Sequence, residues 1–112
     1  MKKKKNLEKQ FEQFNLIFDQ FVKIGKQINS EIIFVFFSDK NTLSKEKIDI
    51  LNENVISLVK SKDLILINIH EIMKNSRNYK KYFPFDGSRF GHFNEAGYEL
   101  VAKEIEKYLI QD

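Results

Sequence analysis

The chain has 112 residues, a formal net charge of +3, no cysteine and a single proline. This length corresponds to one small domain. With 42% hydrophobic and 31% charged residues, the composition is that of a globular protein rather than a disordered one. The absence of cysteine excludes a disulfide framework, thiolate metal sites and a cysteine nucleophile.

The positive charge is concentrated at the amino terminus. Subtracting the four charges of Lys2–Lys5 from the total of +3 leaves −1 for the rest of the chain. We therefore predict a basic, flexible tail over residues 1–6. We expect no nucleic-acid surface, since that would need basic residues spread over a folded face.

No segment of the sequence is expected to span a membrane. The longest wholly apolar run, Ile32–Phe37, is far shorter than the ~18 residues that a span requires. Charged residues interrupt the stretch after the lysines, where a signal peptide would need its apolar core. The chain is therefore expected to be soluble and, by default, cytoplasmic.

Apolar side chains recur at three- and four-residue steps between Leu7 and Asn29, which predicts an amphipathic helix. The stripe consists of Phe11, Phe14, Phe18, Phe21, Val22, Gly25 and Ile28. Such a stripe is typical of core packing, so we interpret it as the buried face of the helix.

Two short apolar segments, Glu31–Ser38 and Leu64–Ile69, are predicted to be strands. Their apolar residues are continuous rather than alternating, which indicates that both faces of each strand are covered. A polar loop over residues 38–42 follows the first strand, and Ser44 is the predicted N-cap of a helix that runs to about Ser61.

The carboxyl-terminal third is predicted to contain a short helical turn over residues 71–75 and an irregular aromatic loop over residues 77–91. Asn94 is then expected to cap a last helix that extends to about Leu109. The inward-facing residues of this helix are predicted to be Tyr98, Val101, Ile105 and either Tyr108 or Leu109.

The alternation of helices and strands predicts an α/β protein with a three-layer, flavodoxin-like parallel sheet over residues 7–112. The sheet is incomplete, with two clear strands beside three main helices, and two parallel strands leave both edges open. We therefore expect either that a partner chain or a second copy supplies strands, or that the chain is part of a larger fold.

Two histidines and two serines are the candidates for chemistry. His70 follows the second strand, at the edge where open α/β sheets bind ligands, and His92 lies on a short loop directly before the last helix. Ser38 ends the first strand and Ser88 lies near His92, but neither is in a recognisable nucleophile elbow, so both are interpreted as structural. Metal binding by the two histidines is a weaker alternative, because their spacing is not that of metal ligands.

The segment His92-x-Asn94-x-x-Gly97-Tyr98-x-x-x-Ala102 resembles the last sequence block of the SGNH/GDSL hydrolases. The resemblance implies hydrolysis or transfer of an ester-linked acyl group, with a serine nucleophile and a histidine base. It implies that His92 is the general base, that Asn94 is a helix cap, that Gly97 permits close packing and that Ala102 is a small packing residue. No cofactor or metal is implied.

The sequence departs from the family in two respects. The family's carboxylate lies three residues before the histidine, where this chain has Arg89, so either Asp86 or a backbone carbonyl is expected to orient His92. The Gly-Asp-Ser block that carries the nucleophile is absent. The resemblance is thus to the carboxyl-terminal part of such an enzyme, which is expected to be inactive until a serine-bearing segment completes it. The alternative is a small non-catalytic interaction module that homodimerises through the open sheet edge.

Overall fold

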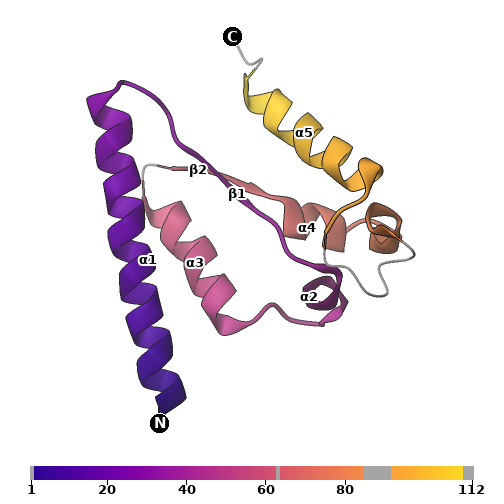
Figure 1. The fold of residues 1–112 in the computed structure, drawn as a ribbon, viewed down its shortest axis with the longest axis horizontal. Coiled ribbons are helices and arrows are strands. Elements are labelled where there is room, and N and C mark those ends of the chain that lie inside the picture. Colours follow the sequence, from indigo (N-terminus) through magenta and orange to yellow (C-terminus); the bar gives the residue numbers. More distant parts are fainter. Residues whose placement is uncertain (1, 63, 85–91, 110–112) are drawn as a thin grey trace. The chain divides into compact units, whose positions relative to one another are not determined.

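The computed structural model describes residues 2–62, 64–84 and 92–109 (Figure 1). The described elements in chain order are α1 (Lys2–Gln27), β1 (Ile33–Phe36), α2 (Lys40–Ser44), α3 (Ile50–Ser61), β2 (Ile65–Asn68), α4 (Ile69–Lys74), the 3-10 helix η1 (Tyr79–Tyr82) and α5 (Glu95–Leu109). They form a mixed α/β fold with a parallel pair of strands, which confirms the predicted fold class.

The two strands are shorter than predicted and only partly buried. In β1 only Phe36 is buried, in β2 only Ile67 is, and the other strand residues are partly buried. The prediction that both faces of both strands would be covered therefore holds for these two positions and not for the remaining strand residues. Within the described part of the chain, the sheet has no third strand.

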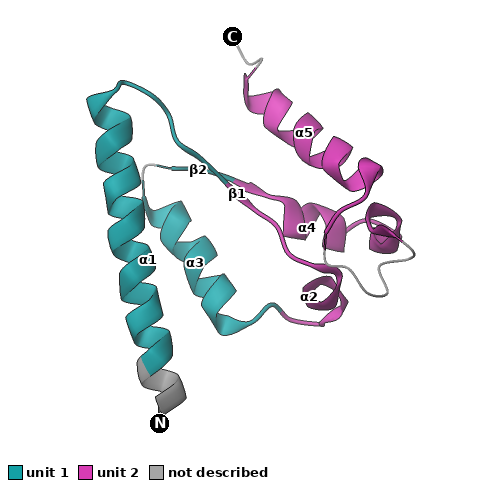
Figure 2. Cartoon of the chain, in the orientation of Figure 1, with its two compact units in different colours: residues 1–34, 48–66 teal, residues 35–47, 67–112 magenta. Residues whose placement is uncertain are grey.

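The chain divides into two compact units, and each strand contributes residues to both (Figure 2). Unit 1 consists of residues 1–34 and 48–66, and unit 2 of residues 35–47 and 67–112. In unit 1, α1 packs against α3 through a core whose buried members are Phe18, Val55, Leu58 and Val59. The ring of Phe34 meets that of Phe18 edge-on, with centroids 5.1 Å apart.

The first helix differs from its prediction at both ends. It begins at Lys2 rather than Leu7, so the backbone of the predicted flexible tail is helical from Lys2 onward. Lysine is a good helix former, and neither glycine nor proline interrupts this segment. The helix ends at Gln27 because Asn29 adopts a left-handed conformation (φ 54°) and the Ser30 amide donates to the carbonyl of Gly25.

The buried face of α1 is narrower than its apolar stripe. Phe18 and Gly25 are buried, whereas Phe21 and Ile28, predicted to be core residues, are 44% and 62% exposed. Further apolar residues of α1 are also exposed, namely Leu16, Ile17 and Ile24. One partner helix covers only part of the circumference of α1, so spacing alone did not identify the covered face.

The caps between β1 and α3 also differ from the prediction. Ser44 is the last residue of α2 and not a cap. The carboxylate of Asp39 accepts from the Thr42 amide at 2.8 Å and starts α2 inside the predicted loop, and Asp49 accepts from the Asn52 amide at 2.9 Å and starts α3. Both are Asp N-caps, which compete well with serine for this role.

In unit 2 the core is formed by buried side chains from several short elements: Phe36, Leu43, Ile67, Ile69, Met73, Phe83 and Phe93. The short helix predicted for residues 71–75 begins earlier, at Ile69, because the Asn68 side chain accepts from the Glu71 amide. Within the predicted aromatic loop the structure places η1, and residues 85–91 of that loop lie outside the described residues.

The last helix has the predicted cap but not the predicted burial. Asn94 Oδ1 accepts from the Gly97 amide at 3.0 Å, which confirms the cap. Gly97 is buried, whereas Tyr98, Tyr108 and Leu109 are exposed rather than inward-facing. Ala102 is exposed as well, so its interpretation as a small packing residue is wrong.

Candidate functional site

The strand-end pocket of unit 2 is an open cavity of about 300 Å³ at the carboxyl end of β1. Its lining comes from the segment that follows β1 and from the beginning of α5, and comprises Phe37, Ser38, Asp39, His92, Phe93, Tyr98 and Val101. Most of the exposed lining surface is apolar, and Ser38, Asp39 and His92 add polar groups. That combination is typical of a small-molecule site, and the carboxyl edge of a parallel sheet is where such sites form.

His92 lies in this pocket, directly before α5, and its side chain is exposed. Its Nδ1 lies 3.1 Å from the backbone carbonyl of Phe93. A carbonyl can only accept, so this hydrogen bond assigns the proton to Nδ1 and the basic lone pair to Nε2. The sequence allows a backbone carbonyl as one of two groups that could orient His92. The structure contains such a carbonyl, that of Phe93.

The two residues directly after His92 are fixed by hydrogen bonds and ring contacts. Asn94 donates its amide to the Tyr82 carbonyl at 2.9 Å and its side-chain Nδ2 to the Lys81 carbonyl at 2.8 Å. The buried ring of Phe93 contacts three other rings, those of Phe37, Phe83 and Tyr98, with centroid distances of 5.5, 5.4 and 5.8 Å. These contacts hold the backbone that directly follows the imidazole, as a preorganised base requires.

Gly97 lies in the first turn of α5, next to the same loop, and its position has no room for a side chain. An added Cβ would lie 2.6 Å from Cβ of Phe93 and 2.7 Å from the carbonyl oxygen of Tyr82. Close packing is the role that the family resemblance implies for this glycine. The start of α5 can therefore approach η1 and the His92 loop closely.

Asp86, the predicted carboxylate partner of His92, lies outside the described residues, as do Ser88 and Arg89. The pairing of Asp86 with His92 therefore stays a prediction. Among the described residues, no group of three or more histidine and carboxylate side chains is arranged to hold a metal ion.

The structure pairs Ser38 with His70, which sequence reasoning did not. The Ser38 hydroxyl oxygen lies 2.5 Å from Nδ1 of His70, although the two residues are 32 positions apart. His70 is only 9% exposed, and its ring packs edge-on against Phe36. Burial, assisted by the positive charge of Lys74, lowers the pKa of His70 below its ordinary value, while Glu71 acts in the opposite direction.

A signal for this pair was present in the sequence. Ser38 follows the first predicted strand and His70 follows the second, and the carboxyl ends of adjacent parallel strands lie at the same edge of a sheet. Neither residue has a motif of its own, so the sequence presents His70 as a separate candidate and Ser38 as structural, and does not pair them.

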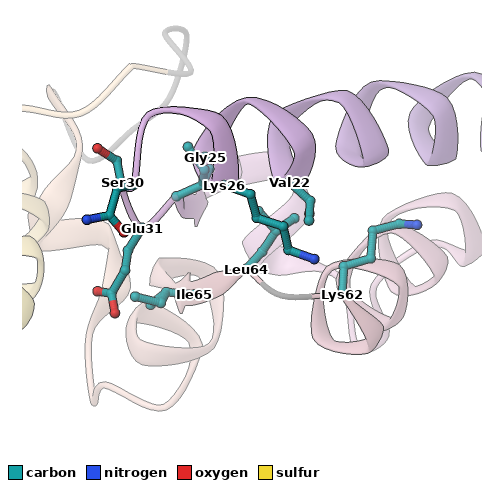
Figure 3. Close-up of a pocket in the computed structure, with 10 residues that line it drawn as sticks. Val22, Gly25, Lys26, Ser30, Glu31, Lys62, Leu64 and Ile65 are labelled. Carbon is teal, nitrogen blue, oxygen red and sulfur yellow. The ribbon is translucent and has the colours of Figure 1, made fainter.

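A second cavity, of about 350 Å³, lies in unit 1 between the last turns of α1 and the amino ends of the strands (Figure 3). Its charged lining residues are Lys26, Glu31 and Lys62. Lys62 forms an ion pair with Asp19 at 2.5 Å. This cavity contains neither histidine and lies at the edge of the sheet opposite the one where α/β folds bind ligands, so the strand-end pocket is the better candidate.

None of the three comparisons with known proteins, against family models, curated proteins and solved structures, found a match. The functional argument is therefore made from the geometry of the strand-end pocket. Across the described residues, no helix is both long enough and apolar enough to cross a membrane.

Proposed function

We propose that this chain is the His-bearing, carboxyl-terminal part of an SGNH/GDSL-like serine esterase or acyltransferase, with His92 as the general base. The observation that carries the proposal is the hydrogen bond between His92 Nδ1 and the Phe93 carbonyl, inside an apolar pocket. This bond places the ring proton on Nδ1, so Nε2 carries the lone pair that a general base uses. The sequence motif from His92 to Gly97 supports the same role.

The chemistry follows the serine-histidine scheme. Nε2 of His92 takes the proton of a serine hydroxyl as that oxygen attacks the ester carbonyl, and then returns it to the departing alcohol. The Phe93 carbonyl keeps the imidazole oriented, and Asp86 is the alternative orienting group that the sequence predicts. The apolar wall formed by Phe37, Tyr98 and Val101 offers an environment for the acyl chain.

The test is turnover of a p-nitrophenyl ester by the full chain, alone and mixed with the protein encoded immediately upstream. We expect turnover only in the mixture, because this chain lacks the Gly-Asp-Ser block. His92→Ala should lower that turnover by about 10²–10⁴-fold, which is the contribution of a general base. Lys80→Ala, an exposed residue of η1, is the control and should retain it. Turnover that is unchanged in His92→Ala would overturn the proposal.

A second candidate function is a non-catalytic module that homodimerises through the sheet edge. It is favoured by one observation: within the described residues, β1 and β2 pair only with each other, so each has one side without a ladder partner. A second copy of the chain could pair there and cover the open edge. Light scattering distinguishes the candidates, because a stable homodimer without ester turnover in any mixture would support the module, and a monomer would exclude it.

A further inference from the structure

Ser38 and His70 meet because of the sheet. β1 ends at Phe36 and β2 at Asn68, and the Ile65 amide donates to the Ile32 carbonyl at 3.0 Å where the strands begin. Because the two strands are parallel and begin side by side, the residues that follow their carboxyl ends lie at the same edge of the sheet. Ser38 and His70 both belong to unit 2, in which their side chains meet.

Their geometry is that of a nucleophile and its base. The separation of Oγ and Nδ1, 2.5 Å, is a short hydrogen-bond distance between a hydroxyl and an imidazole nitrogen. Burial lowers the pKa of His70 below its ordinary value and so favours the neutral ring, which is the form that can accept a proton. The contact with Phe36, with ring centroids 5.9 Å apart, restrains the orientation of the imidazole.

Ser38 is also accessible to a substrate. Its side chain is half-buried and lines the strand-end pocket, whose walls include Phe37, Phe93 and Val101. His70 is buried behind it and is not part of the pocket lining. Ser38 thus borders an apolar space while its base is shielded from water, an arrangement that suits attack on an ester of an apolar acyl group.

We propose that Ser38 is a nucleophile that becomes acylated by esters of apolar acyl groups, with His70 as its base. Oγ of Ser38 bonds to the carbonyl carbon while its proton passes to Nδ1 of His70. The bond from that carbon to the leaving oxygen then breaks, and the leaving alcohol takes the proton from His70. The products are acyl-Ser38 and one alcohol. This reaction does not use His92, so it stands or fails separately from the proposed function.

The experiment uses the full chain alone, incubated with p-nitrophenyl butyrate or with a fluorophosphonate, a reagent that forms a stable bond with activated serine hydroxyls. Intact-mass measurement counts the adducts, and fragmentation of the wild-type chain locates them without any variant. We expect a single adduct per chain, on Ser38, with release of one equivalent of p-nitrophenol or fluoride per chain and no continued turnover. Adducts spread over lysines, tyrosines and other serines would overturn the proposal.

Variants then test the base. Ser38→Ala should abolish the adduct, and His70→Asn should slow its formation by about 10²-fold or more. Ser44→Ala is the matched control, because Ser44 is an exposed serine whose hydroxyl donates to the Asn41 carbonyl. Circular dichroism verifies that each variant is folded. A folded His70→Asn variant that is labelled at the wild-type rate would overturn the role of His70.

Discussion

Nζ of Lys74 donates a hydrogen bond to the backbone carbonyl of Leu43 at 2.6 Å, and so links α4 to the last turn of α2. The same ammonium group also bonds the carbonyl of Lys45, the C-cap residue of α2. Carbonyls at a helix end have no partner inside the helix, and a lysine side chain satisfies two of them here. The segment directly after Ser38 is held in place by this contact.

Replacing Lys74 with methionine should therefore destabilise the protein. Lys74→Met keeps most of the side-chain volume but removes the donor, and hydrogen bonds to a charged group contribute about 1.5–3 kcal/mol. We expect a loss of about 1–3 kcal/mol in the free energy of unfolding, measured by urea denaturation. Lys80→Met, at an exposed position of η1, is the control and should cost little. Equal stabilities of the two variants would contradict the capping role.

Substitutions at Asn94 can distinguish the contribution of its side-chain oxygen from that of its side-chain nitrogen. Asn94→Ala removes both the cap on the Gly97 amide and the bond to the Lys81 carbonyl, and should lower the unfolding free energy by about 1–2 kcal/mol. Asn94→Asp keeps the cap and loses only the donor to Lys81, so thermal or urea denaturation should place it between the wild type and Asn94→Ala. An Asp variant as unstable as the Ala variant would show that the Lys81 bond, not the cap, matters.

Gly97 should not tolerate even alanine. The added methyl group would lie well inside contact distance of Phe93 and of the Tyr82 carbonyl, and the latter is backbone that cannot move aside alone. We expect Gly97→Ala to destabilise the protein by about 1–3 kcal/mol, despite the higher helix propensity of alanine. Glu106→Ala, on the exposed side of α5, is the control and should not destabilise. A Gly97→Ala protein that melts at or above the wild-type temperature would contradict the packing.

Two phenylalanines of α1 provide a matched comparison of buried and exposed positions. Phe18 is 3% exposed and contacts Phe34, whereas Phe21 is 44% exposed. Phe18→Ala should cost about 3–5 kcal/mol of unfolding free energy, as expected for truncating a buried aromatic residue. Phe21→Ala should cost far less. A similar cost at both positions would mean that Phe21 is covered in solution, as a second copy of the chain would cover it.

The lowered pKa of His70 predicts how stability changes with pH. The unfolded chain, in which histidine titrates near 6.5, binds a proton more readily than the folded one. Stability should therefore be highest above about pH 6.5 and should fall as the pH drops below that value. Urea denaturation between pH 5 and 8 measures the slope, and His70→Asn should reduce it. Identical slopes in the two proteins would show that His70 is not responsible.

The elements with a clear repeating pattern were predictable. The stripe of α1, the apolar runs of β1 and β2, and the Asn94 cap of α5 are local features, and local features are visible in sequence. The helix starts at Asp39 and Asp49 were missed because serine and aspartate have similar capping preferences. Nothing in a single sequence decides which cap-forming residue is used.

Burial was predicted less well than secondary structure. The apolar character of Phe21, Tyr98 and Leu109 suggested core positions, yet all three are exposed. Periodicity identifies an apolar face, but whether that face is covered depends on how many elements pack against it. In the described part of this chain there are too few elements to cover every apolar face.

The sequence by itself determined the α/β class, the absence of cysteine chemistry, the missing Gly-Asp-Ser block and the placement of His92 before a capped helix. Only the tertiary structure decided which side chains meet. Ser38 and His70 are 32 positions apart, and they come within 2.5 Å because two parallel strands end at one edge. A contact between distant residues is a property of strand pairing and packing, which depends on the whole chain at once, whereas a cap or an amphipathic stripe depends only on near neighbours.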